Sequence, residues 1–419
     1  MKLKDIVTFV SKSVVPQRGA KYNLYSLPSF DENKSAEVLD GAEIQSNKYD
    51  VPNKCILFNK LNVRFKRVWR INNSDSNKIA STEFLPLVVN EDVVDYQYCY
   101  YLLISDEITN YLCGQNSNTS GSHKRIDPQN FLNIDIHLPK MPIQKAIGKT
   151  LSNIDRKIEL NKRINDNLEA QLRLITSRYI FSCPNLEKKR IGEIATVKAG
   201  GDCPITFSKT RTQKCNIPIF SNGTEDRGLY GFTNKANIEG HSITVAARGT
   251  IGYCERRLMP FVPIIRLLAI TPKEDGAYIY LHQVIRGMKF KKNGSVQQQL
   301  TVPEISFIEI PYPHSSVLHE YNKVASSIVE MIERNISENE ILTKQRDELL
   351  PLLMNGQATV NYHLSAKVYP LPIAYKKAMP IETNQTISNT FIQKFDNHTP
   401  SPCLQTSNHS IPKEERNDL

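Results

Sequence analysis

The chain lacks the short motifs that mark most enzymes. Its 419 residues contain no HExxH, no GxSxG, and neither a Pro-Pro nor a Pro-Asp dipeptide. These absences exclude common zinc and serine hydrolase sites, the Asn/Asp-Pro-Pro-aromatic loop of amino methyltransferases and the common carboxylate motif of nucleases. Gly148-Lys149-Thr150 resembles the end of a phosphate-binding loop, but Ile143 stands where that loop needs glycine. We therefore predict no catalytic residue and no metal site in this chain.

The cysteines and the apolar runs limit the compartment. Eight cysteines are present and no two form a CxxC pair, which argues against a zinc site and against a disulfide framework. No apolar run approaches the roughly 20 residues that cross a membrane. Asp5 and Lys12 interrupt the N-terminal segment too early for a signal peptide. These features predict a soluble, cytoplasmic protein with reduced thiols and no membrane partner.

What the chain contains is a long internal repeat. Residues 131–139 lead into a helical pattern over roughly 143–180, and about 174 residues later the similar segment 305–313 leads into another over roughly 317–350. A period of that length is a whole domain plus its connector. It predicts an α+β protein with pseudo-two-fold symmetry, in which two similar mixed α/β domains alternate with two long helices.

Short β-rich stretches, separated by Asn, Asp, Gly and Pro, fill both predicted domains. The aromatic-rich segment 95–104 instead looks helical and buried on one face. The predicted β-rich stretches are 55–58, 84–89 and 134–136 in the first half, and 191–197, 217–220, 243–246 and 264–270 in the second.

Each helical segment carries a coiled-coil seam, because its apolar positions alternate at spacings of three and four. The predicted seam positions are Ile147, Leu151, Ile154, Ile158, Asn161, Asn165, Leu168, Leu172 and Ile175 in the first helix, and Tyr321, Ala325, Ile328, Ile332, Asn335, Asn339, Leu342, Arg346 and Leu349 in the second.

Both seams place two asparagines near their midpoints, Asn161 and Asn165 in one and Asn335 and Asn339 in the other. A buried Asn penalises every register that leaves its amide unpaired. The central pairs meet in a parallel or an antiparallel arrangement, so they specify register but not direction. We predict that the two helices pack on each other within one chain. The alternative is that each packs separately on its own domain.

The net charge of +10 and the isoelectric point near 9.0 favour a polyanionic partner. The terminal segment from residue 361 is nearly balanced in charge, so the excess belongs to the folded body. Two basic runs could face phosphates, or could be solvated surface. Their cations are Lys60, Arg64, Lys66, Arg67 and Arg70 in the first half, and Arg286, Lys289, Lys291 and Lys292 in the second.

Several segments together resemble a known family. They are the matched domain openings 3–9 and 191–197, the Arg-Gly-Thr-Ile-Gly segment 248–252, the glutamine-rich segment 294–300, and the helix entry 139–147. In this order, and duplicated, they resemble the specificity subunit of type I restriction-modification systems over roughly residues 1–356. Residues 122–125 replace the glutamine-rich run in the first half, and His319-Glu320 replaces the glutamine that matches Gln144.

The resemblance implies two target recognition domains that each read one half of a bipartite DNA sequence. An antiparallel pair of conserved helices would set the unread spacer between them. The implied divisions are recognition domains at 1–140 and 184–313, spacer helices at 141–183 and 314–356, and a mostly disordered tail at 357–419. Arg248 joins the nine cations of the two basic runs as a predicted DNA contact.

The resemblance also implies partners that supply the chemistry. Two methyltransferase subunits would dock on the helices and bind S-adenosylmethionine, and motor-nuclease subunits would use ATP and Mg²⁺, so this chain itself would hold no cofactor. Two alternatives remain open. The chain could serve a system whose methylation and cleavage share one partner subunit, or it could be a coiled-coil adaptor that binds RNA or protein instead of duplex DNA.

Overall fold

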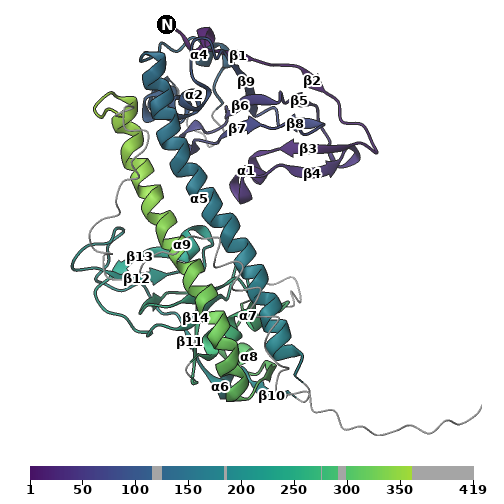
Figure 1. The fold of residues 1–419 in the computed structure, drawn as a ribbon, viewed down its shortest axis with the longest axis vertical. Coiled ribbons are helices and arrows are strands. Elements are labelled where there is room, and N and C mark those ends of the chain that lie inside the picture. Colours follow the sequence, from purple (N-terminus) through teal and green to yellow (C-terminus); the bar gives the residue numbers. More distant parts are fainter. Residues whose placement is uncertain (116–124, 184–185, 275, 291–298, 361–419) are drawn as a thin grey trace, which may run out of the picture. The chain divides into compact units, whose positions relative to one another are not determined.

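The computed structural model describes residues 1–115, 125–183, 186–274, 276–290 and 299–360 (Figure 1). The predicted contacts Lys291 and Lys292, most of the glutamine-rich segment, and the terminal segment from residue 361 lie outside this part of the chain. The described residues form two compact units, the first from residues 1–162 with those described from 336 on, and the second from residues 163–335. In the described ranges, no helix is long and apolar enough to span a membrane, and no cluster of three potential metal ligands occurs.

The first unit contains two sheets. The four-stranded sheet is antiparallel in the order β1-β9-β6-β7, and the five-stranded sheet has the order β2-β5-β8-β3-β4, with β3 parallel to β8. The strands are β1 Val7–Phe9, β2 Ser13–Val14, β3 Lys21–Tyr25, β4 Glu37–Asp40, β5 Lys48–Asp50, β6 Lys54–Asn59, β7 Val68–Asn72, β8 Lys78–Ala80 and β9 Phe84–Val89. The shorter helices are η1 Leu3–Asp5, α1 Leu27–Asn33, η2 Gly41–Glu43, η3 Val63–Phe65, α2 Tyr96–Leu103, α3 Asp106–Gln115 and α4 Pro128–Leu132.

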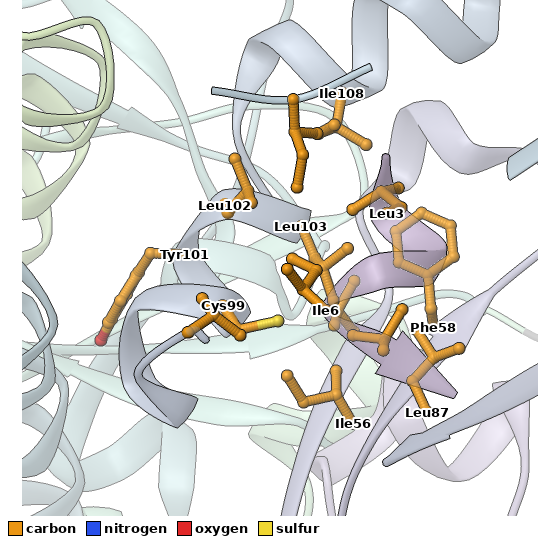
Figure 2. Close-up of a cluster of buried hydrophobic side chains, with 14 of the residues drawn as sticks. Leu3, Ile6, Ile56, Phe58, Leu87, Cys99, Tyr101, Leu102, Leu103 and Ile108 are labelled. Carbon is orange, nitrogen blue, oxygen red and sulfur yellow. The ribbon is translucent and has the colours of Figure 1, made fainter. Parts of the chain in front are cut away.

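Strand β6 explains why this unit has a core on each face of its four-stranded sheet. Successive side chains of a strand point to opposite faces. Ile56 and Phe58 enter the cluster drawn in Figure 2, which also takes Cys99 from α2. Cys55 and Leu57 enter a second cluster around Trp69. Because both faces of this strand are covered, all of its side chains can be apolar, and residues 55–58 are a continuous apolar run.

The second unit repeats the four-stranded sheet of the first, whereas its second sheet has three strands instead of five. Its sheets run β11-β17-β14-β15 and β13-β12-β16, with β12 parallel to β16, and a separate ribbon pairs β10 with β18. The strands are β10 Glu187–Arg190, β11 Ala195–Ala199, β12 Ile217–Phe220, β13 Leu229–Thr233, β14 Ser242–Ala246, β15 Cys254–Arg257, β16 Val262–Pro263, β17 Leu267–Pro272 and β18 Glu309–Tyr312. The shorter helices are α6 Ile191–Ile194, η5 Glu225–Gly228, α7 Ala277–Gly287 and α8 Val302–Ser306.

Chain order makes most strands of the two domains equivalent, whereas β2 and β5 of the first have no counterpart among the described strands of the second. In the four-stranded sheets, β1, β9, β6 and β7 correspond to β11, β17, β14 and β15. The parallel pair β3 and β8 corresponds to β12 and β16, and α2 corresponds to α7. The predicted α+β fold with two similar domains is therefore confirmed at the level of strand order.

The two long helices are α5, Met141–Thr176, followed by a π-helical turn at Ser177–Phe181, and α9, Ser315–Met354. Every predicted seam position in both helices is buried or half-buried. By contrast, the off-seam residues Leu160 and Leu174 are exposed. Helix α9 ends in a glycine cap, in which Gly356 adopts φ +69° and the N–H of Gln357 donates to the carbonyl of Leu352 at 2.9 Å.

Three predicted β stretches are wrong in part. Residues 134–136 form only an isolated bridge, between Asp135 and Lys2. Residues 191–194 form a helical turn, because the carboxylate of Glu193 accepts the N–H of Arg190 in a capping box before β11 begins. At 264–270, the strand starts only at Leu267. The first domain opens in the same way, with the turn η1 ahead of β1, so the matched openings share one local structure.

Candidate nucleic-acid interface

The structure places two of the predicted DNA-binding segments on equivalent hairpins. Residues 60–67 connect β6 to β7, and residues 247–253 connect β14 to β15. Arg248 is therefore the positional counterpart of the first basic run. The sequence shows a second basic run in the second half, but Arg286 and Lys289 of that run lie at and beyond the end of α7, which is equivalent to α2. The two basic runs are not equivalent positions.

The hairpin loop of the first domain has a fixed backbone. The buried side chain of Asn59 accepts the N–H of Leu61 at 2.8 Å and donates to the carbonyl of the same residue at 2.5 Å. Asn62 and Lys66 adopt φ values of 52° and 47°, on either side of the short helix η3. Non-glycine residues rarely adopt this left-handed conformation, so the surrounding contacts must hold it. The loop therefore presents its side chains in a defined arrangement.

At the end of this loop, Phe65 lies between two guanidinium groups. The ring is 52% exposed, and the guanidinium carbons of Arg64 and Arg67 lie 4.9 and 4.8 Å from its centroid. Guanidinium groups stack favourably on aromatic rings, by about 0.5–1 kcal/mol where exposed. The arrangement combines positive charge and an exposed apolar ring at one point of the surface.

The five predicted contacts of the first run separate into two groups. Lys66 pairs with Asp106 at 2.6 Å, Arg67 with Asp31 at 2.6 Å, and Arg70 with Asp155 at 3.2 Å. Within the described ranges, no acidic side chain forms an ion pair with Lys60 or Arg64, and Arg64 is exposed. Lys60 and Arg64 therefore keep the charge that a phosphate would meet.

The hairpin loop of the second domain turns at two glycines and is held by Asn222. The Asn222 amide donates to the carbonyl of Arg248 at 2.8 Å. Gly249 and Gly252 adopt φ values of +76° and +88°, which glycine reaches without steric cost. A Cβ at Gly252 would also lie 2.5 Å from the ring of Phe290. Arg248 is half-buried on this loop.

The remaining predicted contacts of the second domain lie apart from this hairpin loop. Arg286 forms an ion pair with Glu169 at 2.9 Å. Lys289 is exposed, and Lys291 and Lys292 lie outside the described residues.

The four seam asparagines meet in two pairs. Asn161, which is 1% exposed, donates to the side-chain oxygen of Asn339 at 2.9 Å and to Glu338 at 2.8 Å. Asn335 donates to the side-chain oxygen of Asn165 at 2.8 Å. Within the first unit, Asp155 also pairs with Arg346, so the residue numbers rise along α5 while they fall along α9 and the helices are antiparallel. The first pair lies within the first unit and the second pair within the second.

A sequence pattern described as "Type I restriction modification DNA specificity domain" matches residues 1–170 and 185–350. The chain belongs to this specificity family. The two matched segments cover both α/β domains and most of both long helices, so the family pattern follows the duplication seen in the strand order.

Individual relatives agree with this membership. The HindI specificity subunit of Haemophilus influenzae is 22% identical over 412 residues, covering 74% of this chain and 90% of that protein. A Mycoplasma pneumoniae protein named as a type I specificity subunit is 34% identical over 140 residues, 32% of this chain. The chain spans about half the length of this and a second M. pneumoniae relative, 42% and 54%. The S subunit structure from M. genitalium has a TM-score of 0.53 at 16% identity, covering 84% of this chain and 95% of that one, which shows a shared fold.

Sequence reasoning missed the buried arginines of this specificity-family chain. Arg256 and Arg257 end β15 and are 4% and 5% exposed. The guanidinium carbon of Arg257 lies 3.6 Å from the ring centroid of Phe220, and burial lowers its pKa to about 10. The sequence signal that could have indicated a buried cationic partner is Glu169, an acidic residue directly after seam residue Leu168 and therefore close to the packed face of the helix.

The asparagine pair of the first unit gives a measurable coupling. We expect Asn161→Ala and Asn339→Ala to be non-additive by about 1 kcal/mol in the free energy of unfolding, because either change alone leaves the other amide short of a partner. Urea unfolding of the full chain, followed by hydrogen exchange in the first unit, measures the cycle. A cycle between Asn339→Ala and Asn153→Ala, an exposed position of α5, should be additive. Equal coupling in the two cycles would contradict the pairing.

Proposed function

We propose that this chain is the DNA-recognition subunit of a type I restriction-modification complex. Each α/β domain would read one half of a bipartite target, and the antiparallel α5–α9 pair would set the spacer. The proposal divides the chain as the sequence does, into domains at 1–140 and 184–313 and spacer helices at 141–183 and 314–356. The observation that supports it most is the pair of equivalent β hairpins, each with a fixed loop that carries cationic side chains, in a chain of the specificity family.

The loop chemistry fits a duplex. Lysine and arginine neutralise phosphates and position a protein, whereas hydrogen bonds and apolar contacts at base edges give sequence preference. Lys60, Arg64 and Arg248 supply the positive charge, and the exposed Phe65 supplies an apolar surface that suits a thymine methyl group or a sugar. Lys66, Arg67, Arg70 and Arg286 already have carboxylate partners, so we expect them to contribute less to affinity.

The proposal assigns the chemistry to partner subunits in the cytoplasm. Two modification subunits would bring the S-adenosylmethionine site, and restriction subunits would bring ATP-dependent translocation and cleavage. Exposed apolar side chains on both long helices, among them Leu160 on α5 and Ile341 on α9, suit such docking.

The test combines the chain with modification subunits from its native host. Methylation of genomic DNA by this complex should map to one bipartite motif with an unread spacer. Methylation at a continuous motif, or none at all, would contradict the proposal. A neighbouring gene that fuses methylation and cleavage would favour the single-partner system. Retention of the isolated chain on single-stranded RNA, with no preference for duplex DNA, would favour the adaptor.

One substitution tests the first hairpin loop. We expect Arg64→Ala to lower affinity for target DNA and to reduce the slope of log K against log salt by about 1, because one phosphate contact is lost. Filter binding or fluorescence anisotropy over a salt series measures the slope. Lys12→Ala is the control, since Lys12 lies outside this loop and pairs with Asp50 at 2.9 Å. An unchanged slope for Arg64→Ala would remove Arg64 from the interface.

A further inference from the structure

Arg70 and Arg256 are equivalent residues of the two domains. In the first, Arg70 on β7 lies opposite Ile56 of β6, which in turn pairs with Leu87 of β9. In the second, Arg256 on β15 lies opposite Ile243 of β14, which pairs with Ile270 of β17. Both arginines therefore occupy the same register position on the edge strand of the four-stranded sheet.

In the first domain, this arginine reaches the long helices through Asp155. The Asp155 carboxylate, on α5, accepts hydrogen bonds from Arg70 at 3.2 Å and from the Tyr101 hydroxyl at 2.5 Å, and its other oxygen accepts one from Arg346 of α9 at 3.2 Å. The guanidinium carbon of Arg70 lies 4.3 Å from the ring centroid of Tyr100. Burial raises the pKa of Tyr101, so its hydroxyl remains a donor to this carboxylate. One strand residue is thus connected to both α5 and α9.

In the second domain, the equivalent arginine also reaches both helices. Arg256 donates to Glu169 of α5 at 2.5 Å, and its Nε lies 3.9 Å from the carboxylate of Glu333 on α9. Its side chain is 4% exposed, and that of Glu169 is 11% exposed. His282 of α7 lies 3.0 Å from the same guanidinium, and burial with the nearby Arg256 charge holds the pKa of that imidazole well below its usual value. A neutral His282 avoids a second positive charge beside Arg256.

We propose that Arg70 and Arg256, the helix-docking arginines, fix the orientation of each recognition domain on the helix pair and thereby determine which spacer length the protein accepts. This inference rests on the proposed function, and it removes Arg70 from the predicted DNA contacts. A half-buried or buried ion pair has a narrow range of favourable geometries, and once its partner moves away the desolvated charge is left uncompensated. Apolar packing between a sheet and a helix tolerates sliding more readily than such a contact does.

The experiment uses the full chain assembled with its modification subunits. A plasmid library carries the two half-sites that the wild-type complex methylates, separated by spacers of different lengths, and sequencing reads the methylation. For Asp155→Asn and Glu169→Gln, we expect the ratio of methylation at the preferred spacer to that at neighbouring lengths to fall by about tenfold or more. Base preference within each half-site should be retained. Asp166→Asn, an exposed position of α5, is the matched control.

A lower total activity with an unchanged spacer profile would show a merely structural role and would overturn the proposal. A second measurement does not depend on DNA. Genetically encoded spin labels at Val38 of β4 and Arg156 of α5, both exposed and both in the first unit, report the distance between domain and helix. We expect Asp155→Asn to broaden the distance distribution. An unchanged distance distribution would overturn the docking role, whatever the methylation assay shows. A wild-type complex that methylates no bipartite site would instead contradict only the proposed function.

Discussion

Replacing Glu169 with alanine is expected to destabilise the second unit by about 3–5 kcal/mol, because it leaves a buried guanidinium without its carboxylate. Glu169 accepts hydrogen bonds from Arg256 and Gln283 and forms an ion pair with Arg286. Arg256 cannot turn toward water, since its side chain is 4% exposed. The nearest other carboxylate, Glu333, is 3.9 Å from it and already accepts two hydrogen bonds from Arg227.

Native-state hydrogen exchange of the full chain measures this loss in the amides of β14, β15 and α7. Asp166→Ala, one turn away and exposed, should change the same amides by no more than about 0.5 kcal/mol. If Glu169→Ala and Asp166→Ala had equal effects, the Arg256–Glu169 contact would contribute nothing to this unit.

The effect of Glu169 should depend on pH in a defined direction. Burial raises the pKa of the Glu169 carboxyl, but the charges and hydrogen bonds of Arg256, together with Arg286 and Gln283, outweigh it and leave that pKa lowered. A lowered folded-state pKa means that the stabilisation is complete above the unfolded value, about 4.3 for glutamate, and is lost as pH falls through the folded value. The stability difference between wild type and Glu169→Ala should therefore be constant near neutrality and shrink in acid.

The sequence predicts the long helices well because their signal is periodic. A seam of alternating spacings extends over the whole of α5 and α9, so a few atypical positions, such as Arg346, do not hide it. Asn161 and Asn339 could be matched because both lie at the same place in their seams. Direction could not be inferred from them, since central pairs meet in either orientation. The direction of the helices follows only from the contacts in the structure, where Asn161 pairs with Asn339.

The equivalence of the two hairpin loops could not be predicted, because it depends on strand pairing and not on sequence similarity. Residues 60–67 and 248–252 share no motif, and only the order β6-β7 and β14-β15 aligns them. The same limit applies to Arg70. In the sequence it is one of five cations in a basic run, whereas in the structure it lies beyond the loop on β7 and faces Asp155, a residue far away in the chain.

In each domain, one long helix packs closely against the N-terminal end of a domain helix, and a glycine makes room for the contact. In the first domain, Asp95 caps α2 by accepting the N–H of Tyr98 at 2.9 Å, and Gly148 of α5 faces that cap. In the second, the residue before α7 is Gly276, and Asn322 of α9 faces it, with its amide nitrogen 2.5 Å from where a Cβ would lie. In each contact, one helix contributes a side chain and the other contributes a glycine. Adding a side chain at the glycine position would therefore overpack the contact.

Gly148→Ala is therefore expected to destabilise the first unit by about 3 kcal/mol, through overpacking and the loss of a helix cap. The added Cβ would lie 2.7 Å from the capping oxygen of Asp95 and 2.8 Å from the backbone nitrogen of Tyr98. Gly114→Ala is the control, because Gly114 lies in α3 with nothing within 4 Å of its Cβ position, and alanine there should stabilise the helix by up to about 1 kcal/mol. Hydrogen exchange in α2 and urea midpoints of both variants measure the difference. Two variants of equal stability would mean that α5 does not approach the α2 cap this closely.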